Sequence, residues 1–172
     1  MTAVEVITAE VHTPIVEIRL LRDEAATQGL ATALAASFKA LAKRDAIIEL
    51  HGNLGAGKTT FTRYLLKALG VQGRIKSPTY AVVEPHQGLD GLDISHFDFY
   101  RFNDPREWED AGLRDLYASP GLKIAEWPEQ AAGLLPQADL QIELKALEDE
   151  RREMNIKALT KTGEALLQGL ES

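Results

Sequence analysis

Residues 52–59 read Gly-Asn-Leu-Gly-Ala-Gly-Lys-Thr and fit the pattern G-x-x-x-x-G-K-[ST] of a phosphate-binding loop. The glycines of such a loop let the backbone wrap closely round a phosphate chain, with its N–H groups pointing inward. Lys58 would place a positive charge on the β- and γ-phosphates, and the Thr59 hydroxyl can ligate Mg²⁺. The pattern therefore predicts a nucleotide-phosphate site.

The sequence on either side of the loop has the pattern that such a motif requires. Residues 46–50 form an apolar run that predicts a short buried strand, and 60–69 place Phe61, Leu65 and Leu69 on one helical face. A strand entering the loop and a helix leaving it would add the helix N-terminus to the forces that attract an anion. Strand, loop and helix together predict phosphate binding.

Composition limits what the rest of the chain can be. A length of 172 residues suits one α/β domain, and the lack of cysteine excludes disulfides and thiolate chemistry. The first 14 residues lack the basic start and apolar run of a signal peptide, and no apolar run approaches the roughly 20 residues that span a bilayer. We therefore expect a soluble cytoplasmic protein.

The formal net charge of −7 argues against a protein that grips nucleic acid by bulk electrostatics. Four basic residues after the loop are best interpreted as a solvated helix face, although they are the patch to test for tRNA contact: Arg63, Lys67, Arg74 and Lys76.

Local patterns predict the remaining elements. Asp23 is a typical N-cap for an alanine-rich helix that runs to about residue 43. Further strands are expected at 15–21, 79–84, 93–100, 122–126, 140–146 and 154–159, and further helices at 104–111 and 161–170. The last two strands alternate like a hairpin whose charged tip is 148–152.

A phosphate-binding loop of this kind needs an acidic side chain at the end of a neighbouring strand to hold Mg²⁺ against the phosphates. Asp98 and Glu126 each end a predicted strand. The residues alone leave the two carboxylates equally favoured. Thr79 follows Ser77 and Pro78 in a loop where nucleotide switches often sense the γ-phosphate, but spacing alone favours a simple proline turn.

Four blocks taken together resemble the bacterial TsaE family. They are the loop 52–60, Lys-Ser-Pro-Thr-Tyr at 76–80, His-Phe-Asp-Phe-Tyr-Arg at 96–101 and Glu-Trp-Pro at 126–128. Their order and spacing extend the resemblance over about residues 23–145.

The resemblance implies a P-loop NTPase-like three-layer sandwich, with a mostly parallel central sheet and an antiparallel C-terminal portion. It implies one domain over residues 1–172, in which 1–20 and 161–172 are peripheral. It also implies slow, Mg²⁺-dependent ATP hydrolysis that resets a complex with TsaB and TsaD, in which TsaD modifies adenosine 37 of tRNA. Two alternatives remain, a nucleotide-gated binding module and a small-molecule kinase.

The resemblance also assigns roles to residues. Lys58 would bind the β/γ-phosphates, Thr59 and Glu126 would hold Mg²⁺, Asp98 would orient water or the outer shell of the metal, and Thr79 would act as a switch-like sensor. Thr27 would lie near the nucleotide base. The loop residues expected to contact the nucleotide are Asn53, Leu54, Gly55, Ala56, Gly57, Lys58, Thr59 and Thr60.

The chain departs from the family pattern in two places that bear on the site. Asn53 stands where the family usually has an acidic residue. Glu-Arg-Arg at 150–152 replaces a Gly-Arg near the last strands, so no arginine contact is predicted there.

Overall fold

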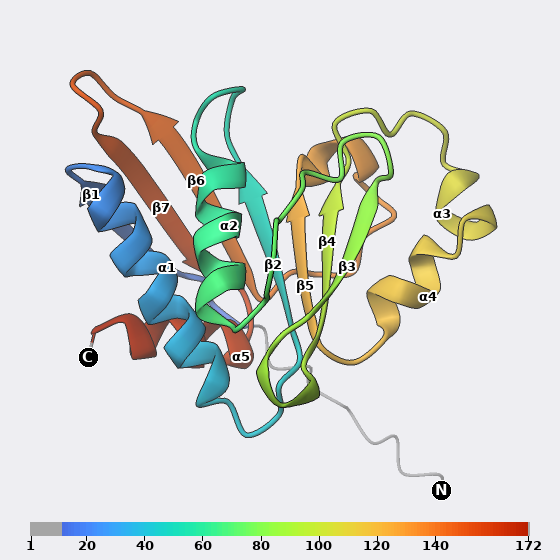
Figure 1. The fold of residues 1–172 in the computed structure, drawn as a ribbon, viewed down its shortest axis with the longest axis horizontal. Helices are drawn as coiled ribbons and strands as arrows, with labels where there is room; N and C mark the ends of the chain where they lie inside the picture. Colours follow the sequence, from blue (N-terminus) through green and yellow to red (C-terminus); the bar gives the residue numbers. More distant parts are fainter. Residues whose placement is uncertain (1–11, 172) are drawn as a thin grey trace, which may run out of the picture.

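A computed structural model describes residues 12–171 as a seven-stranded mixed sheet with helices on both faces (Figure 1). Residues 1–11, most of the segment that we expect not to be a signal peptide, lie outside the described part. The strands are β1 (Ile15–Leu21), β2 (Ala46–His51), β3 (Val83–Gln87), β4 (Asp93–Asp98), β5 (Leu122–Glu126), β6 (Leu140–Ala146) and β7 (Arg152–Ala158). The helices are α1 (Glu24–Lys39), α2 (Lys58–Ala68), α3 (Glu107–Asp110), α4 (Leu113–Ala118) and α5 (Lys161–Gln168).

The strand order is β1-β7-β6-β2-β5-β4-β3. The four central strands β6, β2, β5 and β4 run parallel, whereas β7, β1 and β3 pair antiparallel at the two ends. This is the predicted α/β sandwich with a parallel centre and an antiparallel C-terminal portion. The register sets Glu126 of β5 opposite both Leu50 of β2 and Asp98 of β4, so the strand that enters the loop and both candidate carboxylates end at the same edge.

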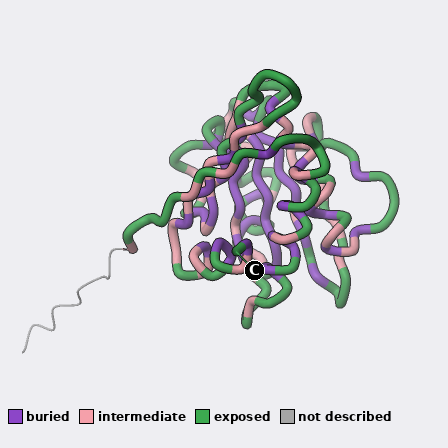
Figure 2. Tube along the Cα trace, turned by 90° about the vertical axis from the view of Figure 1, so that its left-hand side faces the viewer, coloured by how far each residue is buried: buried purple, intermediate pink, exposed green. Residues whose placement is uncertain are grey.

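Alternation along the central strands builds two cores. Ile48, Leu50 and Ile124 face α1, α2 and α5, in a cluster that also takes in Leu34 and Phe38 of α1. Phe97 and Ala125, on the opposite face, pack against the aromatic side chains of α3 and α4 and a 3-10 turn at Pro128–Ala131. Figure 2 shows the sheet strands as the buried centre of the molecule. All five residues of β5 are buried, because both faces of this central strand are covered, whereas β6 alternates buried and more exposed residues.

Helix α1 begins as its sequence predicts. The Asp23 carboxylate accepts a hydrogen bond from the Ala26 N–H at 2.8 Å, which satisfies one of the free amide groups of the first turn. Leu30, Leu34 and Phe38 recur at helical spacing and are all buried.

Two predictions from local pattern are wrong. The strand expected at 79–84 begins only at Val83, because Val82 has a positive φ of 66° that breaks the extended backbone. The helix expected at 104–111 is the single turn α3, and α4 follows it without having been predicted. Gly112, at a φ of 69°, separates the two, and the buried pair Leu113 and Tyr117 at i, i+4 was the signal for α4.

No helix within residues 12–171 is long and apolar enough to cross a membrane.

Candidate nucleotide-binding site

The loop at 52–57 joins β2 to α2, as its motif requires, and two of its glycines are needed where they stand. Gly52 has a φ of 142°, and a Cβ there would lie 2.5 Å from the carbonyl oxygen of Leu144. Gly57 caps α2 with a φ of 104°, and no side chain of the described residues caps that helix. The first N–H groups of α2 are therefore available to an anion.

Lys58, at the start of α2, is only 5% exposed. Its Nζ donates to the carbonyl oxygens of Gly52 and Asn53, the second at 3.1 Å, and lies 4.0 Å from the centroid of the Trp127 ring. Burial lowers the pKa of this ammonium group, an effect that the nearby carboxylates of Glu126, Glu129 and Asp98 oppose. A desolvated cation of this kind is well suited to meeting a phosphate.

Glu126 lies beside the first turn of α2 and is 1% exposed. One carboxylate oxygen, Oε1, accepts a hydrogen bond from the Thr59 hydroxyl at 2.9 Å. The other, Oε2, lies 2.5 Å from Nε2 of His96. A hydroxyl and a carboxylate at hydrogen-bond distance are the protein ligands that P-loop sites use for Mg²⁺.

Asp98 ends β4 next to Glu126 and is 5% exposed. Its oxygens accept hydrogen bonds from the Tyr100 N–H at 2.9 Å and from the Thr79 hydroxyl at 3.3 Å. Burial raises the pKa of this carboxyl group, and the hydrogen bond from Tyr100 opposes the rise. The sequence left Asp98 and Glu126 as competing candidates, and the fold brings both to the loop.

A cavity of about 360 Å³ collects most of the predicted residues. It is lined by 54–60 of the loop and α2, together with Thr79, Asp98 and Glu126. Asn53 lines a neighbouring cavity instead and contributes its carbonyl oxygen to Lys58. Trp127 and Tyr100 stand at the wall, with ring centroids 5.0 Å apart.

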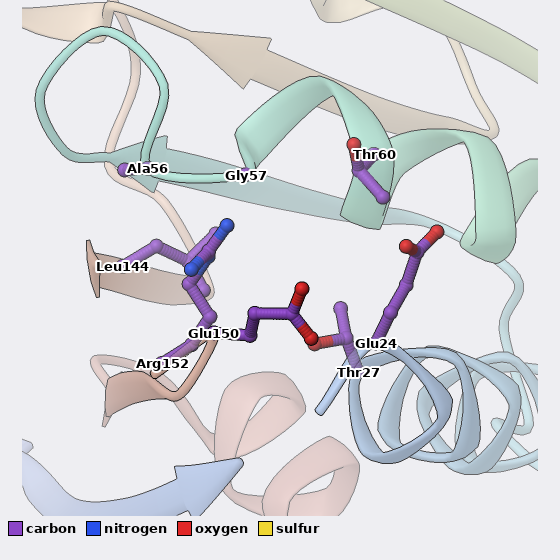
Figure 3. Close-up of a pocket in the computed structure, with 8 residues that line it drawn as sticks. All are labelled: Glu24, Thr27, Ala56, Gly57, Thr60, Leu144, Glu150 and Arg152. Atoms are coloured by element: carbon purple, nitrogen blue, oxygen red, sulfur yellow. The ribbon is translucent and has the colours of Figure 1, made fainter. Parts of the chain in front are cut away.

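A second cavity of about 200 Å³ continues from the loop between α1 and the β6–β7 hairpin (Figure 3). Thr27 lines it, together with Glu24, Thr60 and Glu150. Thr27 is thus separated from the cavity that holds the carboxylates, although both cavities reach Gly57 and Thr60.

Arg152 lines both cavities, so an arginine lies beside the loop although the sequence departs from the family pattern at 150–152. A Cβ on Gly57 would lie 3.4 Å from its Nε. The sequence predicts a solvated hairpin tip over 148–152, but Arg152 is already the first residue of β7. The backbone turns at Asp149 and Glu150, which have φ values of 58° and 64°, and this places Arg152 beside the loop. The arginine that the resemblance expects near the last strands was the available signal.

The residues present fit Mg²⁺-ATP. Among residues 12–171 no group of three or more His, Asp or Glu side chains could hold a metal by itself. Magnesium in nucleotide sites needs no such group, because it takes one or two protein oxygens and completes its shell with phosphates and water. Thr59 and Glu126 supply such a pair at 2.9 Å, and Lys58 and the start of α2 supply the attraction for phosphate.

Comparison with known proteins gives one consistent answer. The family model described as threonylcarbamoyl adenosine biosynthesis protein TsaE matches residues 21–154. The protein of that name from Haemophilus influenzae is 42% identical over 116 residues, which cover 67% of this chain and 71% of the relative. The one from Bacillus subtilis is 37% identical over 139 residues, covering 80% and 85%.

A solved structure agrees with these sequences. The crystal structure of Bacillus subtilis YdiB matches with a TM-score of 0.74 and 30% identity, covering 93% of this chain and 97% of that one. The fold, the order of the motifs and the extent of the family match lead to one conclusion: the chain belongs to the TsaE family.

Proposed function

We propose that this protein is a cytoplasmic Mg²⁺-dependent ATPase that assists the complex making N⁶-threonylcarbamoyladenosine at position 37 of tRNA. The observation that carries the proposal is the hydrogen bond of 2.9 Å between Thr59 and Glu126, at the mouth of a loop that also holds a buried lysine. The relatives named for threonylcarbamoyladenosine biosynthesis support the biological setting.

The residues divide the chemistry among them. Mg²⁺, held by Thr59 and Glu126, would neutralise phosphate charge when bound. Lys58 would exchange its two loop carbonyls for the β- and γ-phosphates and stabilise the charge that develops on them. Asp98 lies on the same edge of the sheet as Glu126 and can orient an attacking water. Burial raises the pKa of Asp98, which makes its carboxylate a better proton acceptor.

Thr79 would report on the nucleotide. Its hydroxyl is hydrogen-bonded to the Ser77 hydroxyl at 2.9 Å and to the Asp98 carboxylate at 3.3 Å. A ligand that attracts the Thr79 hydroxyl would therefore pull the loop that leads to β3. This coupling fits a protein that spends ATP on changing its contacts with partners, which we propose are TsaB and TsaD. Contact with tRNA would be indirect, in keeping with the net charge of −7.

The scattered arginines favour hydrolysis over small-molecule phosphoryl transfer. Kinases of that class close an arginine-rich lid over the phosphates. Here Arg101 stacks on Tyr80 with its guanidinium carbon 4.6 Å from the ring centroid, and Arg106 and Arg114 pair with carboxylates of their own segments. Within residues 12–171 only Arg152 reaches either cavity.

Substitution of Glu126 by glutamine tests the proposal. The variant keeps the size of the side chain but removes the charge, and we expect ATP turnover in the presence of TsaB and TsaD to fall by roughly 10²-fold or more. Glu109→Gln, on the exposed end of α3, is the matched control and should turn over ATP like the wild type. Equal turnover by the Glu126 variant would overturn the site.

Two further measurements separate the alternatives. Rapid transfer of phosphate to a small acceptor, in place of hydrolysis, would indicate a kinase. Binding of TsaB and TsaD is then titrated with ATP, with ADP and without nucleotide. Nucleotide-dependent binding with no measurable turnover would indicate a gated binding module.

A further inference from the structure

His96 is a buried histidine that the roles above leave unused. It lies on β4 two residues before Asp98, and its side chain is 1% exposed. Its Nε2 lies 2.5 Å from Oε2 of Glu126, whose side chain is 2% exposed. This is the shorter of the two contacts that the Glu126 carboxylate makes, since Oε1 lies 2.9 Å from the Thr59 hydroxyl.

The two contacts hold the carboxylate from opposite sides. With Oε2 fixed by His96, Oε1 is left to face Thr59, and rotation about the last bond of the side chain would break both hydrogen bonds. The strand pairing adds a rigid base, because His96 lies opposite Ile124 and Asp98 lies opposite Glu126 in the same register. Helix α2, the paired strands β4 and β5, and the His96 side chain therefore together fix the position of the Glu126 carboxylate.

The surroundings of His96 argue that the hydrogen bond, not packing, accounts for a polar residue here. Ile94 on the same strand, at the same face, is buried in the core cluster, as is the facing Ile124. Nδ1 of His96 is buried and has no partner among the described residues. Burying an imidazole with only one of its two nitrogens hydrogen-bonded lowers the stability of the fold, whereas a leucine in the same place would not. A neutral imidazole that donates from Nε2 has no proton on Nδ1, so this tautomer leaves no buried N–H unpaired.

We propose that His96 is a positioning residue that orients Glu126 toward Thr59 and so sets the affinity of the nucleotide site for Mg²⁺. The inference rests on the proposed function, because it concerns the metal of the same site. Hydrogen-bond partners of a metal-ligating side chain typically change metal affinity by about 10- to 100-fold when removed. Loss of His96 should therefore act on the metal and leave the phosphate loop itself intact.

Three substitutions distinguish orientation from packing. His96→Leu fills the space without a donor. His96→Gln places its amide nitrogen close to the position of Nε2, whereas His96→Asn is shorter and places its amide near the position of Nδ1. Orientation predicts that Gln behaves like the wild type and that Asn behaves like Leu. A packing role would rank the variants by volume and apolarity.

The experiment measures ATP binding by calorimetry, first in EDTA and then over a titration with Mg²⁺, using the full chain. We expect His96→Leu and His96→Asn to need about 10-fold more Mg²⁺ for half-maximal tightening of ATP binding, with affinities in EDTA within about 2-fold of the wild type. His86→Leu is the matched control. This histidine lies on the neighbouring strand β3 opposite Ile94, and its substitution should leave the Mg²⁺ requirement unchanged.

The outcomes separate the two hypotheses. A wild-type protein that binds ATP equally with and without Mg²⁺ would overturn the proposed function. A wild type that responds to Mg²⁺, with Leu and Asn variants that need no more Mg²⁺ than the wild type, would overturn the role of His96 alone. If His96→Leu does not fold, the comparison of Gln with Asn decides, because equal Mg²⁺ requirements in those two variants contradict orientation.

Discussion

Two lysines are buried at opposite ends of the parallel strands, and they are held in different ways. Lys123, near the start of β5, is 3% exposed, and its Nζ donates to Asp45 at 2.6 Å, to the Ser119 carbonyl at 2.7 Å and to the Gly121 carbonyl at 3.0 Å. Lys58, at the carboxyl ends, is 5% exposed and donates to two loop carbonyls beside an aromatic face.

The difference shows which features distinguish a buried charge at a candidate ligand site from one that only stabilises the fold. All three donors of Lys123 find fixed oxygen acceptors, one of them charged, so the group completes a structural joint between β2 and β5. Burial lowers the pKa of Lys58, and its acceptors belong to a loop whose amides suit an anion. Burial and charge alone would select both residues, and their place at opposite strand ends separates them, because ligands of open α/β sheets bind at the carboxyl ends.

The largest effect that tests this comparison is on ATP turnover. Lys58→Met keeps the length of the side chain but removes the charge that would meet the phosphates. We expect turnover to fall by about 10²-fold or more and the free energy of unfolding to change by less than about 1 kcal/mol. Turnover assays and urea unfolding measure the two quantities. A variant that hydrolyses ATP normally would place Lys58 in the same class as Lys123.

The opposite result is expected for Lys123→Met. It leaves a carboxylate and two carbonyl oxygens without their donor, so we expect the free energy of unfolding to fall by about 2 to 3 kcal/mol. ATP affinity of the folded protein should not change, because the site lies at the other end of the sheet. Lys43→Met is the matched control. Its Nζ is 4.0 Å from the same Asp45, but its side chain is 85% exposed, so its loss should cost less than about 0.5 kcal/mol. Equal losses of stability in the two variants would contradict the role given to Lys123.

The sequence predicts the site at the carboxyl ends of the parallel strands better than it predicts the buried lysine at their other ends. The loop at 52–59 predicts a phosphate site from its pattern alone, since a fixed pattern between a strand and a helix leaves few structural alternatives. Asp98 and Glu126 could each be recognised as strand-terminal acids, but their joint presence depends on the register of β4 and β5, which no local pattern contains. Arg152 reaches the loop through the positive φ angles of Asp149 and Glu150, in a charge run that favours a solvated turn by itself. Nothing local distinguishes Lys123 from a surface lysine, because its three acceptors come from the folded junction of β2 and β5.

The smallest effect concerns the carboxylates near each lysine. Asp45, beside Lys123, makes an ion pair with it at 2.6 Å, whereas Asp98 is 5% exposed and accepts its hydrogen bonds from the uncharged groups of Thr79 and Tyr100. Burial raises the pKa of Asp98 above that of an aspartate in the unfolded chain. The folded state therefore holds this proton more tightly, and the wild type loses stability as the pH rises through the raised pKa.

Asp98→Asn removes that loss, because an amide has no charge to bury and can still accept from the Tyr100 N–H. We expect the variant to melt roughly 2 °C higher than the wild type at pH 8, which corresponds to less than about 1 kcal/mol. The advantage should shrink as the pH falls and vanish below about 4, the ordinary pKa of an aspartate, because the wild-type carboxyl is then increasingly protonated in both states. Asp110→Asn, on the exposed end of α3, should show no such pH dependence. An asparagine variant that is less stable than the wild type at pH 8 would mean that Asp98, like the Asp45 carboxylate, is held by favourable partners as a charged group. The site without nucleotide would then resemble the Lys123–Asp45 ion pair at the other end of the sheet more closely than the contacts of Lys58 indicate.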